Sequence, residues 1–302
     1  MPRFLLLFLL LKYTAVVRAL SSTSSASSQM KRILVTGANT GIGLALTKQL
    51  VKDHGCYVYL GSRDVVKGQK AVEEVKKTSG DSVELLNIDV SNEDSVRSAA
   101  ESLRSKLASE KLYAVVNNAG TGIMHKTKPA EILDTNTRGP RRVVNHFLPL
   151  IDNDCGRIVN VGSGAGPMYV ANSLRNKNDK RRYLQPMSEA QIEDEITKIL
   201  STNDDYVAYS GSKALLACYT MELAQSHPNL MISIITPGYI MTAMTEGAGA
   251  TKEPHEGTVS LKKALFHELP SSGWFWGSDG LRSPCHYLRN PGEPEFDGVV
   301  DI

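Results

Sequence analysis

The sequence predicts a doubly wound α/β fold built on a parallel sheet, and two patterns carry this prediction. Short runs rich in β-branched apolar residues recur along the chain, and segments with helical apolar spacing separate them. Near-continuous apolar strands alternating with amphipathic helices are typical of a parallel sheet covered on both faces. Because crossovers between parallel strands are right-handed, a doubly wound sheet is the economical topology.

The expected elements follow one another without a linker from residue 32 to about 237, so one domain over residues 31–302 fits better than two. Residues 273–277 suit a last strand that closes the sheet. The clearest helical patterns cover residues 44–51 and 65–75. The earlier strands are expected at residues 33–35, 57–60, 83–88, 114–116, 158–161 and 231–235.

Composition is that of an ordinary globular chain, with 41% apolar and 22% charged residues among 302. The net charge of +2 gives no electrostatic argument for nucleic acid as a partner. The cysteines are far apart and have neither CxxC nor Cys/His ligand spacing, so we expect thiols packed as small apolar groups and no metal site. They are Cys56, Cys155, Cys218 and Cys285.

Residues 1–30 differ from the rest of the chain. An apolar run over residues 4–11 is followed by basic residues and a serine-rich stretch, and no acidic residue precedes Asp53. The run is too short to span a bilayer, which needs roughly twenty residues, but it suits a signal-peptide core. A cleaved presequence for the secretory pathway or an organelle is expected, with a two-part, plastid-type form possible. The alternative is a disordered tail with an apolar patch and a cytoplasmic location.

A glycine-rich loop over residues 36–43 lies between the first strand and the first helix. Such glycines permit a tight turn and let a pyrophosphate approach the helix N-terminus closely. Glycines also mark ordinary turns, but the flanking strand and helix favour dinucleotide binding, as in a Rossmann fold. The candidate contacts are Gly37, Asn39, Thr40, Gly41, Ile42 and Gly43.

Arg63 and Lys67 follow the second strand, where an acidic residue would favour NAD and a cationic one can pair with the 2′-phosphate of NADP. The intervening Asp64 is expected to cap the next helix. The alternative is a pair of solvated surface charges. We predict NADP(H) as the cofactor.

Tyr209 and Lys213 are four residues apart, so a helix places them on one face. A nearby ammonium should lower the tyrosine pKa and make Tyr209 an acid–base catalyst for a carbonyl oxygen. Ser163, after the fifth strand, can donate a hydrogen bond to the same oxygen. Each residue alone has an ordinary structural explanation, whereas their joint placement at the carboxyl ends of successive strands favours function.

These residues occur with the glycine loop, Asn117–Gly120 and Asn136 in an order that resembles the short-chain dehydrogenase/reductase family. The resemblance covers residues 32 to about 245, and the long interval from Ser163 to Tyr209 is most like the carbonyl reductase branch. Gly162 stands where many relatives have another serine, but the catalytic position is kept by Ser163. The resemblance implies that Lys213 holds the nicotinamide ribose and that Asn136 orders a water linking Lys213 to solvent.

The resemblance also implies further cofactor contacts. Asp89 follows the third strand, where relatives bind adenine, and the turn after the fourth strand lines the cofactor cleft. Two positions after the sixth strand match those that contact the nicotinamide carboxamide. The residues concerned are Asp89, Asn118, Ala119, Gly120, Pro237, Gly238, Ile240 and Thr242.

An insert over about residues 165–205 separates Ser163 from Tyr209. Ser188 and Gln191 predict a capping box that starts a short helix beside the active site. In the resembled branch a comparable insert covers the surface used for oligomerisation, which implies a monomer. The basic residues 180–182 are expected to be solvated.

Residues 239–270 form the expected substrate lobe, and core packing is the alternative for its large apolar side chains. The end of the chain, about residues 284–298, is expected to extend over the surface. The apolar residues expected to line the pocket are Met241, Met244, Phe266 and Leu269.

The sequence thus predicts a reductase of small-molecule aldehydes, ketones or quinones, without nucleic-acid partners, metal or a transmembrane span in the mature domain. One alternative is a catalytically idle NADP-binding sensor or partner protein. Another keeps the chemistry in a dedicated organellar reductase of a pigment, lipid or steroid.

Overall fold

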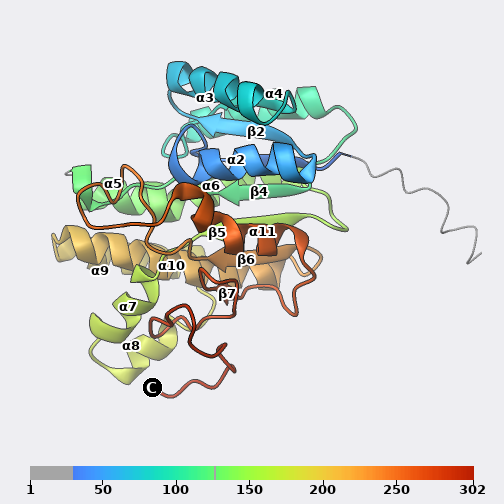
Figure 1. Cartoon of the computed structure of the whole chain (residues 1–302). Helices are drawn as coiled ribbons and strands as arrows, with labels where there is room; N and C mark the ends of the chain where they lie inside the picture. Colours follow the sequence, from blue (N-terminus) through green and yellow to red (C-terminus); the bar gives the residue numbers. More distant parts are fainter. Residues whose placement is uncertain (1–29, 126) are drawn as a thin grey trace, which may run out of the picture. The chain divides into compact units, whose positions relative to one another are not determined.

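Seven parallel strands form the central sheet of the unit Arg32–Ile302 (Figure 1). The structure is a computed structural model, which describes residues 30–125 and 127–302. The strands lie in the order β3-β2-β1-β4-β5-β6-β7, so the direction of winding reverses between β1 and β4. They are β1 Arg32–Val35, β2 Tyr57–Ser62, β3 Val83–Asn87, β4 Ala114–Asn117, β5 Arg157–Val161, β6 Met231–Ile235 and β7 Phe275–Trp276.

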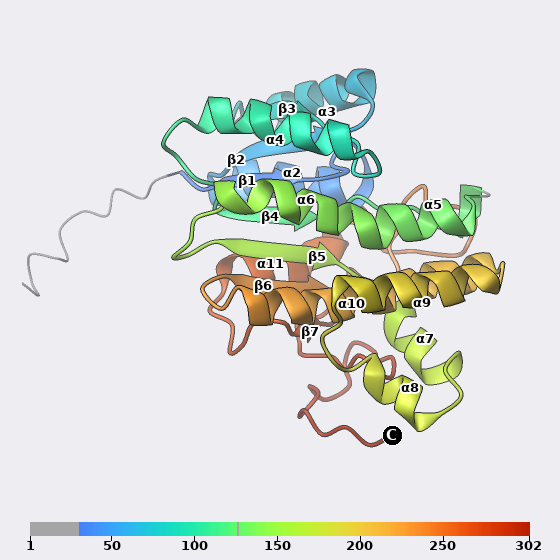
Figure 2. The ribbon, with the colours of Figure 1, turned by 180° about the vertical axis from the view of Figure 1, so that it is seen from behind.

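Helices cover both faces of the sheet (Figures 1 and 2). The buried side chains of α2, α3 and α11 share one apolar cluster, and those of α4, α6 and α10 share another. The helices are α2 Gly41–His54, α3 Val65–Thr78, α4 Glu93–Leu107, α5 Pro129–Leu133, α6 Gly139–Phe147, α7 Ala165–Asn172, α8 Lys177–Arg182, α9 Glu189–Ser201, α10 Asp205–Ser226 and α11 Val259–Phe266. The shorter helical segments are the 3₁₀ helices η1 Ile123–His125, η3 Leu148–Leu150 and η4 Pro254–Thr258 and the π-helix η2 Asp134–Arg138.

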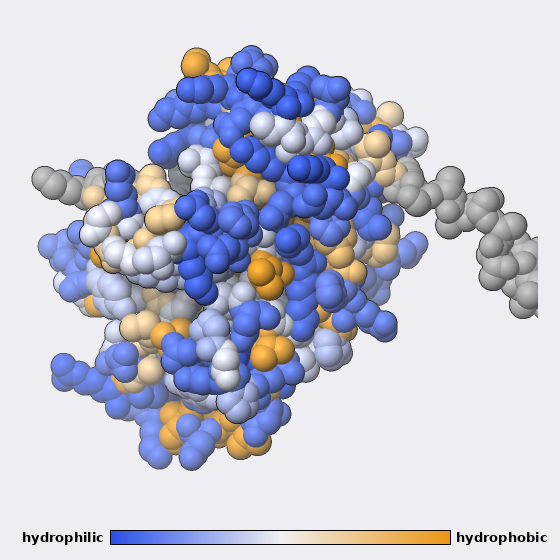
Figure 3. Space-filling view, in the orientation of Figure 1, coloured by the Kyte–Doolittle hydropathy of each residue, from blue (hydrophilic) through white to orange (hydrophobic). Residues whose placement is uncertain are grey.

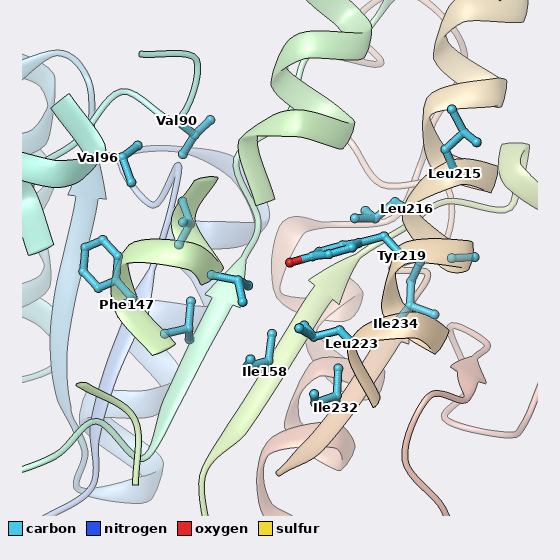
Figure 4. Close-up of a cluster of buried hydrophobic side chains, with 14 of the residues drawn as sticks. Val90, Val96, Phe147, Ile158, Leu215, Leu216, Tyr219, Leu223, Ile232 and Ile234 are labelled. Carbon is cyan, nitrogen blue, oxygen red and sulfur yellow. The ribbon is translucent and has the colours of Figure 1, made fainter. Parts of the chain in front are cut away.

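Successive residues of a strand contribute to opposite faces of the sheet, as the pleat requires. Ile33 and Val35 of β1 belong to the cluster under α2 and α3, whereas Leu34 belongs to the cluster under α4 and α10. Figure 4 shows the second cluster, where Phe147 of α6 and Leu223 of α10 lie over the sheet. Burial on both faces explains why the strands are largely apolar.

The predicted doubly wound parallel sheet is confirmed, with the expected strands in place. Helix α2 begins at Gly41, three residues earlier than the apolar pattern suggested, because the end of the glycine loop is already helical. The expected last strand is shorter than its sequence pattern and consists of Phe275–Trp276.

The insert holds three helices, α7, α8 and α9, where the sequence suggested one. Helix α9 begins at the predicted capping box, in which Ser188 and Gln191 bond each other's backbone. Of the basic residues expected to be solvated, Arg181 is exposed, whereas Lys180 and Arg182 are partly buried. Lys180 donates to the Ala171 carbonyl at 2.7 Å, and Arg182 pairs with the buried Glu195 at 3.0 Å.

The chain after β7 is anchored and does not simply extend over the surface as expected. Arg289 has only 2% of its side chain exposed and pairs with Asp279. A buried guanidinium requires several acceptors, and it finds them within this segment. The C-terminal residues are therefore a folded part of the unit.

The four cysteines form no disulfide bond, but Cys155 is exposed, contrary to the expected packing of all four. None of the helices within residues 30–125 and 127–302 has the length and apolar content to span a bilayer. The predicted presequence lies outside the described residues, apart from Met30.

Ion pairs join helix α9 of the insert to η2 and α6. Glu193 of α9 accepts from Arg141 at 2.8 Å and from Arg138 at 2.6 Å. Glu189 also pairs with Arg141, whose side chain is only 9% exposed. Hydrogen bonds from Arg138, which outweigh burial, hold the pKa of Glu193 below its ordinary value.

We predict that Glu193→Gln lowers the free energy of unfolding at pH 7 by about 1 kcal/mol, because Arg141 loses a charged partner. A carboxylate with a lowered pKa stabilises the fold above its ordinary pKa, and this contribution disappears as pH falls through the lowered value. The difference between wild type and variant should therefore shrink from pH 7 to pH 3 in urea titrations. Asp194→Asn, on an exposed residue of the same helix, is the control. A pH-independent difference would contradict the prediction.

Candidate active site

Hydrogen bonds to one threonine join the carboxyl ends of β1 and β4. The backbone N–H groups of Asn118 and Ala119 donate to Thr36 Oγ1 at 3.1 and 3.0 Å. The Asn118 side chain donates to the carbonyls of Thr36 at 2.8 Å and Gly37 at 3.1 Å. Asn118 therefore braces the glycine loop, and Thr36 is a site residue that the sequence prediction missed.

The glycine loop packs too tightly against β4 for side chains at two positions. Gly37 has φ +63°, and a Cβ there would lie 2.8 Å from the Ala119 Cα. A Cβ at Gly43 would lie 2.5 Å from Asn118 Nδ2. Both positions require glycine, and the loop consequently follows the strand ends closely.

The N-terminus of α2 differs from those of the other long helices in the described chain. The N-cap Thr40 makes no side-chain capping hydrogen bond. In contrast, Asp64, Asn92, Ser188 and Asp204 cap α3, α4, α9 and α10. The first-turn N–H groups of α2 have no intrahelical acceptors, so they and the helix dipole are available to an anion. This end of α2 includes Asn39, Thr40, Gly41, Ile42 and Gly43 as predicted.

Two predicted cationic residues lie beyond the end of β2, beside the glycine loop. Ala38 N–H bonds the Gly61 carbonyl at 2.9 Å, which holds the loop against this strand. Arg63 is exposed, and its guanidinium forms no hydrogen bond or ion pair with the residues that the structure describes. Lys67 is exposed and 4.0 Å from Asp64, which caps α3 as expected.

Asp89, expected near adenine, lies half-buried after β3. One of its oxygens accepts from both the N–H and the hydroxyl of Ser91, at 3.0 and 2.6 Å. The carboxylate thus organises the turn into α4. The other oxygen of Asp89, Oδ2, takes no part in these two hydrogen bonds.

Tyr209 and Ser163 meet at the carboxyl end of β5. Tyr209 lies in the first turns of α10 and is half-buried, and Ser163 comes two residues after the end of β5. Burial raises the pKa of Tyr209, and a hydrogen bond from Ser163 opposes this rise. The two hydroxyls are therefore together, as the sequence suggested.

Lys213 is buried one helical turn after Tyr209. Its Nζ donates to the Val161 carbonyl at 2.9 Å, and burial lowers the pKa of Lys213 to about 8. The expectation that Lys213 lowers the pKa of Tyr209 is wrong for the protein alone, because desolvation dominates and raises it. Tyr209 thus holds its proton at neutral pH.

Asn136 lies in the short π-helix η2 and is almost completely buried. Its amide exchanges hydrogen bonds with the backbone of Thr121, both at 2.9 Å, and donates to Ser212 Oγ at 3.1 Å. A Cβ placed on Gly120 would lie 3.2 Å from Asn136 Oδ1 and 3.7 Å from Lys213 Nζ. The side chains of Asn136 and Lys213 therefore both lie next to Gly120. No sequence pattern predicts this π-helix, a feature often found at functional sites.

The loop after β6 closes over the glycine loop. Ile240 is buried, and both it and Ile42 approach Gly257, at 2.9 and 3.4 Å from an added Cβ. The Thr242 methyl group would lie 3.3 Å from a Cβ on Gly41. Two further predicted residues, Pro237 and Gly238 with φ +89°, form the turn that leads into this loop.

The expected substrate-lobe residues divide into two groups. Met244 lies beside Gly122, whose added Cβ would be 2.7 Å from Met244 Cγ and 3.9 Å from the Tyr209 ring. Met241 is exposed on the same loop. The expectation is wrong for Phe266, which stacks on His54 at 4.2 Å, and for Leu269, which is buried in the core. Helix α11 ends at Phe266, beside His54 at the end of α2, and Leu269 follows in the next loop.

The described residues hold no cluster of three or more His, Cys, Asp or Glu side chains placed to bind a metal ion. The face in Figure 3 is largely hydrophilic, with apolar residues in small separate patches. The chemistry at this edge thus rests on hydroxyl, amide and amine groups.

Comparisons with known proteins agree with this geometry. The sequence model of the family described as short chain dehydrogenase matches residues 31–174. A (+)-neomenthol dehydrogenase of Arabidopsis thaliana is 30% identical over 288 residues, covering 80% of this chain and 94% of that protein. Carbonyl reductase 3 of Rattus norvegicus, whose name specifies NADPH, is 28% identical over 245 residues, covering 74% and 87%. The structure of salutaridine reductase from Papaver somniferum matches with TM-score 0.70 and 26% identity, covering 81% and 99%.

We predict that Thr36→Val lowers the free energy of unfolding by about 1–3 kcal/mol, because two backbone N–H groups lose their acceptor. Thr36→Ser keeps the acceptor oxygen and should stay within about 1 kcal/mol of wild type. Urea unfolding followed by fluorescence measures both variants. Equal stabilities of the Val and Ser variants would contradict the bracing role.

Proposed function

This chain belongs to the short-chain dehydrogenase/reductase family, and we propose that it uses NADPH to reduce the carbonyl group of an aldehyde, ketone or quinone. The observation that carries the proposal is the meeting of Tyr209 and Ser163 beside the buried Lys213. These residues lie at the same edge of the sheet as the uncapped helix α2. An acid, a hydrogen-bond donor and an anion site thus share one edge.

The residues at this edge fit a dinucleotide. The uncapped first turn of α2 and the glycines that allow close approach suit a pyrophosphate. Arg63 and Lys67 would pair with a 2′-phosphate, which favours NADPH over NADH. Asp89 would lie near the adenine, and the turn 118–120 with residues 237–242 would border the nicotinamide. The proposed contacts include Ala119, Gly120, Pro237, Gly238, Ile240 and Thr242.

NADPH, when bound, supplies the hydride that reduces the carbonyl carbon. Tyr209 donates its proton to the carbonyl oxygen, so that carbonyl, hydride and proton give an alcohol. The raised pKa keeps Tyr209 protonated at neutral pH, which suits the direction of reduction. Ser163 donates a hydrogen bond to the same oxygen as negative charge develops there.

Lys213 and Asn136 support this proton transfer. Lys213, with a pKa of about 8, can hold or release a proton near neutral pH, and it would contact the nicotinamide ribose. Asn136 fixes the turn at Thr121 beside Gly120 and would order a water between Lys213 and solvent. Neither residue replaces Tyr209 as the acid.

We also propose that the protein acts as a monomer. Helix α9 packs against α5 and α10, and the family resemblance implies that an insert at this place covers the surface that other members use to oligomerise. The ion pairs of Arg138 and Arg141 hold α9 there. Sedimentation at micromolar concentration tests this, and a dimer would contradict it. A cleaved presequence for an organelle or the secretory pathway remains our prediction from sequence.

We predict that Tyr209→Phe lowers kcat by about 10²–10⁴-fold, because the variant has no proton to donate to the carbonyl oxygen. NADPH oxidation is followed by absorbance against a panel of aldehydes, ketones and quinones. Tyr206→Phe, on an exposed tyrosine one turn earlier in α10, should stay close to wild type. NADPH binding without turnover by wild type would instead favour the idle sensor.

We predict that Arg63→Ala lowers kcat/KM for NADPH by about 10–100-fold and leaves that for NADH unchanged, because only NADPH carries the 2′-phosphate. Lys70→Ala, on an exposed residue of α3, is the matched control. A wild-type preference for NADH would overturn the proposed cofactor.

A further inference from the structure

The C-terminal segment, here residues 277–296, returns to the carboxyl end of β5. Figures 1 and 2 both show the end of the chain beside α7 and α8. Leu288 of this segment comes near the site, because its Cδ1 lies 2.7 Å from the position of a Cβ on Gly164. Gly164 directly follows Ser163, so an apolar side chain from the chain terminus lies next to the hydroxyl pair.

Leu288 keeps a free surface at this place. Its side chain is 41% exposed, although it touches Gly164. Ser163 Oγ accepts from the Ala165 N–H at 3.2 Å, and hydrogen bonding from Ser163 opposes the rise in the pKa of Tyr209. A carbonyl group held by Ser163 and Tyr209 would therefore have Leu288 at its side.

Arg289 fixes the backbone next to Leu288. Its Nε donates to Ser283 Oγ at 3.0 Å, its Nη1 to the Glu293 carbonyl at 2.7 Å, and its Nη2 to Asp279. A Cβ on Gly277 would lie 2.6 Å from Nη2, so the guanidinium fills its space completely. A planar, buried group with this many acceptors has one position, and that position sets the place of Leu288.

Other loops at this edge also present apolar side chains. Ile123 and Met124 follow β4, and Met241 follows β6; all three are more than a third exposed. Met244, from the same loop as Met241, and the Tyr209 ring both lie beside Gly122. Leu288 is thus one of several partly exposed apolar side chains at this edge of the sheet.

We propose that Leu288 is a wall of the substrate pocket that favours carbonyl compounds with a bulky apolar ring, and that Arg289 is its positioning residue. This inference rests on the proposed reductase function. Contact with the leucine stabilises a ring that reaches it, whereas a short-chain ketone is too small to do so. Truncation of the wall should therefore affect the two substrates differently.

The experiment compares kcat/KM of the full protein with NADPH for butanone and for the two-ring ketone 1-tetralone. Leu288→Ala should lower the value for 1-tetralone about tenfold relative to butanone. Leu281→Ala removes another partly exposed leucine of the same segment and should leave the ratio unchanged. An unchanged ratio in Leu288→Ala, or an equal change in Leu281→Ala, overturns the inference.

A double-mutant cycle tests Arg289. Arg289→Lys keeps the charge but loses the forked geometry, so it should shift the substrate ratio in the same direction as Leu288→Ala. In the Leu288→Ala background it should add little, because the wall is already absent. Full additivity overturns the positioning role. If Arg289→Lys does not fold, the comparison of the two leucine variants still decides the role of Leu288.

The same experiment distinguishes a failure of the proposed reductase function from a failure of the inference about Leu288. Wild-type protein that reduces none of the ketones, aldehydes or quinones removes that function and this inference with it. Wild-type protein that turns over, with variants of unchanged selectivity, removes the inference alone.

Discussion

The hydroxyl of Thr36 holds together the two strand ends at which the sheet reverses its direction of winding. It accepts from the backbone of Asn118 and Ala119, so the loop after β1 and the turn after β4 keep one relative position. The first carries the uncapped end of α2, and the second leads to Gly120, beside Asn136 and Lys213. The anion site and the proton-transfer groups are thus fixed to each other through this joint. A crevice at such a reversal is where open α/β sheets generally bind ligands.

Much of the fold and part of the site could be predicted because they depend on short-range spacing. A strand buried on both faces is almost continuously apolar, and this signal predicts both ends of β6 to the residue. The four-residue step from Tyr209 to Lys213 places both on one side of α10 whatever surrounds the helix. The glycine loop was recognisable for a similar reason, since a tight turn between strand and helix limits the residue types that fit.

What sequence reasoning missed depends on groups brought together from distant parts of the chain. Thr36 and Asn118 are 82 residues apart, and nothing local to either announces their hydrogen bonds. The pKa of Tyr209 rises because the fold removes its hydroxyl from water, a quantity that spacing does not contain. Phe266 and Leu269 are large apolar side chains suited to a pocket, yet Phe266 packs against the core beside His54 and Leu269 is buried in it. The partners of Arg289, in contrast, are near it in sequence, but no helical or strand spacing announces the turn that brings Asp279 and Ser283 to its guanidinium.

The position of β7 has a consequence for biosynthesis. This strand consists of Phe275 and Trp276, and it covers the edge of β6 only after the long segment between the two strands, residues 236–274, has been made. At about 5–20 residues per second, the ribosome leaves β6 for some seconds with unpaired backbone groups on an apolar edge. Such an edge is a template for pairing with other chains, so the nascent protein is most exposed to aggregation just before its last strand emerges.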